Sequence, residues 1–186
     1  MARLILGLGN PGPTYRETRH NVGFRVVEEL ARRRGLALDR AECGALTASS
    51  PDLTLANPQL YMNRSGYAAR CLIELYGFAP EEILVVYDEV ALPLGRLRLR
   101  ASGSPGGHRG MESILEQLRT DQVPRLRLGV AGSEGPPLGE GLADYVLGPF
   151  PDDEKEAVEA MILRAADACE AWASEGAEAA MSRFNG

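Results

Sequence analysis

The sequence contains few of the residues with which small proteins form disulfide bonds or bind structural metal ions. Its 186 residues include three cysteines and two histidines. Cys43, Cys71 and Cys169 are odd in number and widely spaced, so we expect the reduced thiols of a cytosolic protein rather than a disulfide framework. His20 and His108 are too few for a histidine-rich zinc site, and we expect neither a metal nor a cofactor.

Long apolar segments are also absent. No stretch approaches the ~20 apolar residues that cross a bilayer, and the N-terminal segment MARLILG has no apolar signal-peptide core and no cleavage site. We therefore expect a cytoplasmic protein that has no membrane partner. A chain of 186 residues is long enough to bury roughly 70% of the surface that its unfolded form exposes. We expect it to form a single domain over residues 1–186 and to be monomeric.

Positive charge is scarce overall and concentrated in one segment. The formal net charge is -6, which taken alone disfavours nucleic acid as a partner. Between residues 96 and 127, however, seven arginines are accompanied by only three acids, a local excess of +4. This segment is predicted to bind anions, and the acidic residues after position 134 are predicted to form a solvated face. The seven arginines are Arg96, Arg98, Arg100, Arg109, Arg119, Arg125 and Arg127.

Two kinds of apolar pattern alternate along the chain. Short apolar runs predict strands over residues 3–8, 53–56, 83–87 and 126–130, and the polar–apolar alternation of 96–100 predicts a half-exposed strand. Helical spacing predicts helices over 22–34, 65–76, 111–118 and 154–173, and a short helix before Phe184. This order predicts the α/β class, as a single domain in which a mixed β-sheet is sandwiched between helices.

A glycine motif follows the first predicted strand. Residues 7–12, GLGNPG, match G-x-G-x-x-G, the pattern of a dinucleotide-binding loop. In such a loop the helix begins at the glycines, so that its amides face the pyrophosphate. Here the helical spacing starts near Val22, and Pro11 removes one amide donor. We therefore interpret the motif as a tight turn between a strand and a loop.

His20 and Asp88 are the strongest candidates for hydrolytic chemistry. No G-x-S-x-G motif supports a serine nucleophile. His20 precedes a predicted helix, and a histidine with an ordinary pKa of ~6.5 can act as a general base, although a surface or capping histidine is the commoner case. Asp88 follows the strand 83–87, at a position where α/β proteins collect ligands. It could orient His20 and stabilise its protonated form, or it could form an Asx turn.

Other polar residues lie near predicted strand ends and loops. Asn10 and Asn63 can donate to a carbonyl or accept from an N–H, or serve as turn and cap residues. Tyr15 and Tyr61 can stack on a base, cover a peptide, or be partly buried. The glycine-rich segment 103–110 precedes a helix; its amides can cradle a phosphate, or it can be a flexible connector.

Taken together, these segments resemble the bacterial peptidyl-tRNA hydrolase family. The matching segments occur in the family's order and span nearly the whole chain, and the region Asn-Pro-Gly…Thr-Arg-His-Asn is highly specific. The segments are GLGNPG (7–12), Tyr15, TRHNVG (18–23), YMN with SG (61–66), DE (88–89), LP with Gly95 (92–95), GGH (106–108), RLR with Gly129 (125–129) and DYVLG (144–148).

The resemblance implies an activity and a set of site residues. The activity is cleavage of the ester that joins a peptide to the 3′ ribose of tRNA, which recycles tRNA from stalled translation. By position, His20 resembles the base that activates water, Asp88 its orienting acid, and Asn10 the residue that contacts the peptide beside the ester and favours N-blocked substrates. The implied contacts to the substrate are Tyr15, Tyr61 and Asn63, and those to the tRNA backbone are Arg100 and Arg127.

One site residue departs from the family pattern. After Gly107 and His108 the family usually has an asparagine that contacts the end of the tRNA, and this chain has Arg109. We predict that Arg109 is a substitute contact, because a guanidinium can bind phosphate through charge-assisted hydrogen bonds. An alternative is an RNA-binding protein of the same fold without hydrolase activity. The presence of both His20 and Asp88 favours the hydrolase, because binding alone needs neither.

Overall fold

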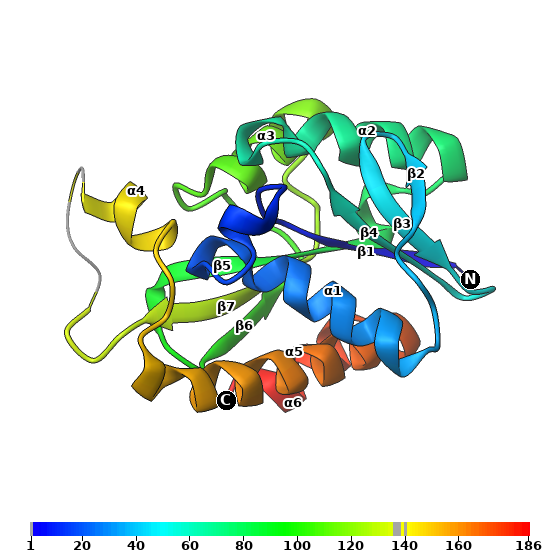
Figure 1. Cartoon of the computed structure of the whole chain (residues 1–186). Coiled ribbons are helices and arrows are strands. Elements are labelled where there is room, and N and C mark those ends of the chain that lie inside the picture. The colour runs from blue at the N-terminus through cyan, green and yellow to red at the C-terminus, as the bar shows by residue number, and fades with distance from the viewer. Residues whose placement is uncertain (1, 136–138, 140) are drawn as a thin grey trace.

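One mixed β-sheet runs through the centre of the molecule. The computed structural model describes residues 2–135, 139 and 141–186. The strand order is β2-β3-β4-β1-β5-β7-β6, with parallel pairs in the middle and antiparallel pairs at both edges (Figure 1). The strands are β1 Arg3–Gly7, β2 Arg40–Glu42, β3 Ala45–Ser49, β4 Leu53–Pro58, β5 Ile83–Pro93, β6 Leu97–Arg100 and β7 Arg125–Ala131.

Helices cover both faces of this sheet. Figure 1 shows α2 and α3 on one face, α1, α5 and α6 on the other, and α4 near the C-terminal ends of the central strands. This arrangement confirms the predicted α/β class. No helix within the described ranges is long and apolar enough to cross a membrane. The helices are α1 Val22–Arg33, α2 Ser65–Tyr76, α3 Arg109–Leu118, α4 Gly141–Val146, α5 Lys155–Glu175 and α6 Ala177–Phe184.

The alternation of side chains along the central strands builds two cores. Leu84 and Val86 of β5 are fully buried on the face that carries α1 and α5, whereas Val85 and Tyr87 are buried on the face that carries α2 and α3. A strand covered on both faces has no polar side, which is why 83–87 is a continuous apolar run in the sequence. The residues that follow Tyr87 are therefore held on a rigid support.

Two glycines let α1 begin close to the sheet. A Cβ on Gly7 would lie 2.4 Å from the carbonyl oxygen of Gly23, and a Cβ on Gly23 would lie 2.3 Å from that of Val86. Both distances are too short for van der Waals contact, so larger residues would push the helix away from β1 and β5. Gly7 of the segment 7–12 thus serves the close packing of the helix on the sheet, and α1 begins at Val22, where the helical spacing predicts it.

Some elements differ from the sequence-based expectation. The local patterns predict neither the hairpin β2–β3 nor the helix α4, because these elements are short and α4 buries none of its residues. The strand β5 does not end at Tyr87 but continues to Pro93 through its pairing with β7. Asp88 therefore lies within a strand and not in an Asx turn.

The prediction of three reduced thiols was wrong for two of them. Cys43 and Cys71 form a disulfide, with their Cα atoms 5.5 Å apart. The tight turn of the β2–β3 hairpin, where Cys43 and Gly44 both adopt positive φ, carries Cys43 toward α2. The two cysteines are 28 positions apart, so no local pattern signals their contact. Cys169 is a free thiol, as expected, and the structure buries it in the core.

Candidate active site

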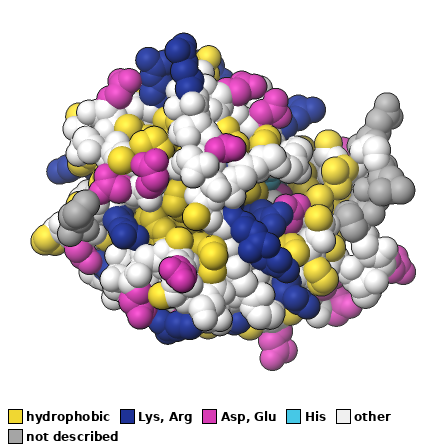
Figure 2. Space-filling model, turned by 180° about the vertical axis from the view of Figure 1, so that it is seen from behind, with side chains coloured by type: hydrophobic (Ala, Val, Ile, Leu, Met, Phe, Trp, Pro, Cys, Tyr) yellow, Lys and Arg dark blue, Asp and Glu magenta, His cyan; other side chains and the backbone are white. Residues whose placement is uncertain are grey.

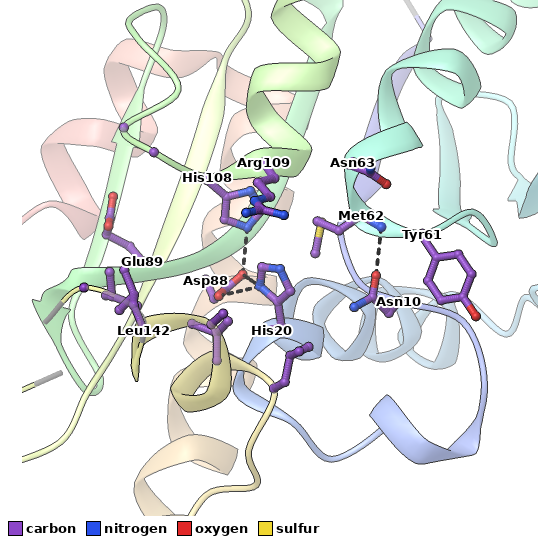
Figure 3. Close-up of a pocket in the computed structure, with 17 residues that line it drawn as sticks. Asn10, His20, Tyr61, Met62, Asn63, Asp88, Glu89, His108, Arg109 and Leu142 are labelled. Atoms are coloured by element: carbon purple, nitrogen blue, oxygen red, sulfur yellow. Dashed lines mark hydrogen bonds and ion pairs between the residues drawn. The ribbon is translucent and has the colours of Figure 1, made fainter. Parts of the chain in front are cut away.

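A cavity of about 590 Å³ opens at the C-terminal ends of β1 and β5. Its walls come from the turn after β1, from the 3-10 turn Met62–Arg64 (η3) and the residue before it, from β5, from the glycine loop before α3, and from α4 (Figure 3). Segments that are far apart in the sequence thus meet around one space. The cavity brings together six of the predicted site residues, which are Asn10, His20, Tyr61, Asn63, Asp88 and Arg109.

Asp88 lies between two histidines. Its Oδ2 is 2.8 Å from Nδ1 of His20, and its Oδ1 is 2.9 Å from Nε2 of His108. The side chain of Asp88 is 1% exposed, and those of His20 and His108 are 13% and 8% exposed. His20 comes from the 3-10 turn Arg19–Asn21 (η2), and His108 is the N-cap residue of α3. Three separate elements therefore converge on one buried carboxylate (Figure 3).

The hydrogen bonds of His108 determine where its proton lies. Its Nδ1 accepts from the backbone N–H groups of Gly110 and Met111, at 3.1 and 3.2 Å. A ring nitrogen that accepts carries no proton, so neutral His108 has its proton on Nε2 and donates it to Asp88. Nδ1 of His20 donates to the same carboxylate. This leaves Nε2 as the basic nitrogen of His20, a side chain that lines the cavity.

Burial and charge act on His20 in opposite directions. Burial lowers the pKa of His20, but the charge and the hydrogen bond of Asp88 raise it, and the resulting pKa lies above the ordinary value of 6.5. The charge of Arg109 offsets part of this increase. For Asp88, burial opposes ionisation, yet its contacts with the two histidines hold its pKa well below the usual range. The carboxylate therefore stays ionised and stabilises a protonated His20.

The same three side chains have the spacing of a possible metal site. One ligand atom from each of His20, Asp88 and His108 lies within 4.8 Å of the others. A metal ion bound to Nε2 of His108 would require the proton of the neutral ring to move to Nδ1. Two backbone N–H groups already point at Nδ1, so this tautomer would lose both hydrogen bonds. The hydrogen bonds of these three side chains are therefore better suited to an unmetallated site, in which both histidines donate to Asp88, than to a bound metal ion.

Asn10 is held firmly at the cavity wall. Its Oδ1 accepts from the backbone N–H of Met62 at 2.8 Å, and its own backbone exchanges two hydrogen bonds of 2.9 Å with the side chain of Asn21. Because Oδ1 is engaged, Nδ2 is the group that Asn10 can offer to a ligand, as a donor. Tyr61 and Asn63, which flank Met62, are exposed at the same end of the cavity (Figure 3).

A face of arginines, formed by β6 and β7, adjoins the cavity. The leucines of these strands point into one core, so the arginines that alternate with them point to the opposite face of the sheet. In the antiparallel register Arg98 lies opposite Arg127, and Arg100 opposite Arg125. Arg127 pairs with Glu89 at 2.8 Å, whereas Arg98 and Arg100 form no ion pair with any described residue. Figure 2 shows basic side chains gathered beside the point where a histidine reaches the surface.

Known proteins share the whole of this architecture. The family model described as peptidyl-tRNA hydrolase matches residues 4–186. The chain belongs to the peptidyl-tRNA hydrolase family. The peptidyl-tRNA hydrolase of Methylacidiphilum infernorum is 46% identical over 185 residues, which cover 98% of this chain and 97% of the relative. That of Moorella thermoacetica is 47% identical over 187 residues, with the same coverage of both chains.

Solved structures agree with the family assignment. A crystal structure of peptidyl-tRNA hydrolase from Acinetobacter baumannii is similar with a TM-score of 0.92 at 34% identity, and the match covers 99% of this chain and 94% of that one. The resemblance drawn from the sequence motifs, the α/β fold and the enzyme class are thereby confirmed.

The roles of individual residues remain predictions in this member of the peptidyl-tRNA hydrolase family. Arg109 lies beside His108 and lines the cavity (Figure 3). Tyr15 belongs to the 3-10 turn Pro13–Tyr15 and is not among the described residues that line the cavity. Its backbone carbonyl accepts from the hydroxyl of Thr18, so the structure gives it a local role in the loop before His20.

Sequence reasoning missed two parts of the site. The contact of His108 with Asp88 was one of them, because His108 lies in the glycine-rich segment 103–110, ahead of the predicted helix 111–118, and no local pattern there signals the contact. The other was α4, whose Leu142 and Val146 line the cavity. Nothing in the composition of that segment distinguishes it from a loop, because the helix has no buried apolar stripe.

Proposed function

We propose that this enzyme hydrolyses the ester between an N-blocked peptide and the 3′ ribose of tRNA, with His20 as the general base. The observation that carries the proposal is the buried carboxylate of Asp88, which accepts from both histidines and leaves Nε2 of His20 basic at the cavity. Burial of a carboxylate is unfavourable unless it is paired. A protein that only binds RNA does not require a buried carboxylate beside a histidine, whereas a general base does.

The proposed reaction uses His20 twice. Nε2 first takes a proton from a water molecule, whose oxygen attacks the carbonyl carbon of the ester. Asp88 stabilises the imidazolium that forms, because it lies 2.8 Å from Nδ1. When the ester bond breaks, the imidazolium returns the proton to the 3′-oxygen of the ribose. The products are a tRNA with an intact 3′ hydroxyl and a free peptide acid, which releases the second proton of the water to solvent and becomes a carboxylate.

Asn10 supplies a reason for a preference for N-blocked substrates. With Oδ1 held by Met62, its Nδ2 group is a donor at the cavity wall. A blocked residue carries an amide carbonyl close to the ester, and this carbonyl can accept from Nδ2. A free amino group is protonated near neutral pH and offers no acceptor there. Free aminoacyl-tRNA would therefore lack this hydrogen bond and gain an unfavourable contact between two donors.

An assay of two substrates tests the hydrolase proposal. N-acetyl-aminoacyl-tRNA and unblocked aminoacyl-tRNA are incubated with the enzyme and with His20→Ala. We expect selective hydrolysis of the blocked substrate, and a loss of about two to four orders of magnitude in turnover for the variant, the range of a lost general base. Near-normal turnover by His20→Ala, or equal rates on both substrates, would contradict the proposal.

The arginine face formed by β6 and β7 is proposed to hold the tRNA backbone. Arg98 and Arg100 form no ion pair with a described residue, so both are available to phosphates. Each neutralised phosphate contributes roughly 0.7 to 0.9 to the slope of log affinity against log salt. Arg100→Ala should therefore raise KM and reduce the salt slope by about one unit. The matched control is Arg183→Ala on α6, which packs against β6 from the opposite face and should change neither quantity.

We also propose where and in what form the enzyme acts. Peptidyl-tRNA arises during translation, so we place the enzyme in the cytoplasm. Asn10, His20, Asp88 and His108 all come from one chain, so a monomer is sufficient for the reaction.

A further inference from the structure

Arg19, the residue directly before His20, joins the catalytic turn to α4. Its Nη1 donates to the carbonyl oxygen of Tyr145 at 2.8 Å, and its guanidinium lies 3.9 Å from the centre of the Tyr145 ring and 5.4 Å from that of Phe150. Its backbone N–H donates to the carbonyl oxygen of Gly148 at 3.1 Å. One residue thus contacts the C-terminal end of α4 and the segment after it through both its main chain and its side chain.

Few other contacts among the described residues hold α4 in place. The helix has six residues and buries none of them, and helices this short are not stable alone. Its second anchor is the hydroxyl of Tyr145, which donates to the carbonyl oxygen of Val130 at 2.7 Å and accepts from the N–H of Gly132 at 3.1 Å. An isolated bridge between Thr18 and Pro149 adds a third. The position of α4 therefore depends on contacts at its C-terminal end.

α4 presents apolar side chains to the cavity. Leu142, Ala143, Val146 and the adjoining Leu147 line it together with His20 (Figure 3). A substrate whose ester reaches His20 therefore lies against these side chains. Displacement of α4 would remove apolar contacts from the substrate, while the hydrogen bond between His20 and the carboxylate behind it would remain.

We propose that Arg19 is a positioning residue that holds α4 against the part of the substrate next to the ester, and so sets the affinity for N-blocked peptidyl-tRNA. The inference rests on the proposed function. A guanidinium suits this place, because it stacks on the ring of Tyr145 while donating to a carbonyl at the end of a helix, where cations are favoured. Lysine can supply the charge and a hydrogen bond but not the planar stack, so Arg19→Lys should restore only part of the function.

The experiment compares Arg19→Ala, Arg19→Lys and a matched control. The control is Arg16→Ala, which removes the same charge from the same loop. Arg16 is exposed, and the ion pair it forms is a long one, 3.7 Å, to Glu28 of α1. Two quantities are measured for each protein. One is hydrogen exchange of the backbone amides of residues 142–148, and the other is kcat and KM for N-acetyl-aminoacyl-tRNA over a range of pH.

We expect Arg19→Ala to accelerate exchange in residues 142–148 and to leave the rest of the chain protected, which shows that the variant is folded. Its KM should rise about tenfold, as for the loss of one charge-assisted hydrogen bond, with little change in kcat or in the pH of the rising limb. Arg19→Lys should lie between Arg19→Ala and the unmodified enzyme, and Arg16→Ala should match the unmodified enzyme.

Three results would overturn the inference. These are unchanged exchange in residues 142–148 of Arg19→Ala, an equal effect of Arg16→Ala, and a shift of the pH profile in place of a rise in KM. The last would show that Arg19 acts on His20 and not on α4. Failure of the proposed function is distinguishable, because the unmodified enzyme would then not hydrolyse the blocked substrate, while the exchange data would still report whether Arg19 holds α4.

Discussion

The two roles of His108 can be removed one at a time. In His108→Asn an amide oxygen stands near the place of Nδ1 and can accept from Gly110 and Met111, but the side chain is too short to reach Asp88. In His108→Gln the amide nitrogen stands near the place of Nε2 and can donate to Asp88, while the cap is lost. His108→Ala removes both contacts.

The magnitudes follow from these contacts. A side-chain cap contributes about 0.5–2 kcal/mol, and a hydrogen bond to a charged partner about 1.5–3 kcal/mol. We expect His108→Ala to lower the free energy of unfolding by about 2–5 kcal/mol, because it loses both. His108→Gln should lose only the contribution of the cap, and His108→Asn only that of the contact with Asp88. Urea unfolding of the four proteins measures the differences.

Among these variants, kcat should depend on whether residue 108 still contacts Asp88 and not on the free energy of unfolding. With one of its two donors gone, Asp88 is held less firmly against His20, so we expect His108→Asn to lose about tenfold in kcat, the equivalent of about 1.4 kcal/mol. His108→Gln should stay close to the unmodified enzyme. The assay is hydrolysis of N-acetyl-aminoacyl-tRNA at concentrations above KM. If His108→Asn is as active as His108→Gln, or if the two variants unfold like His108→Ala, the assignment of the two nitrogens is refuted.

Two further perturbations test the electrostatics and the disulfide. Burial and Arg109 lower the pKa of His20 and Asp88 raises it, and only the neutral base is active. The rising limb of kcat/KM should therefore move to lower pH in Asp88→Asn and to higher pH in Arg109→Ala. If the limb moved in the same direction in both variants, this account of the His20 pKa would be wrong. Reduction of the Cys43–Cys71 disulfide, with a separation of 28 residues, should cost about 3.6 kcal/mol of unfolding free energy. Dithiothreitol should leave the urea midpoint of Cys43→Ser unchanged.

Elements with strong local patterns could be predicted from the sequence. The apolar spacing and basic last turn of 22–34 correspond to α1, which ends at Arg33. The helix 65–76 ends where expected, because Gly77 adopts φ 75, a conformation that glycine takes readily. The alternation of 96–100 corresponds to β6, whose leucines are buried and whose arginines are not. In each case residues that are close together in the sequence determine the structure.

Contacts between distant segments could not be predicted in this way. The sequence resemblance implied that Asp88 and His20 meet, and the structure brings them together, but no local pattern signals that His108 closes on the same carboxylate. Its approach depends on the path of the glycine loop, in which Gly106 and Gly107 both adopt positive φ. The disulfide depends in the same way on how the β2–β3 hairpin packs against α2. The position of α4 depends on hydrogen bonds with Arg19, Val130 and Gly132, which are distant from it or lie outside the helix.

The adjacent carboxylates of β5 have different partners because side chains alternate along a strand. Asp88 meets the imidazoles of His20 and His108, whereas Glu89 meets the guanidinium of Arg127. Glu89 neutralises only one arginine of the face formed by β6 and β7, so Arg98 and Arg100 keep it positive. A slip of one residue between β5 and β7 would turn each carboxylate to the opposite face of the sheet and away from its present partner. The register of this strand therefore keeps the proposed proton transfer apart from the proposed tRNA contacts, although the two carboxylates are neighbours in the chain.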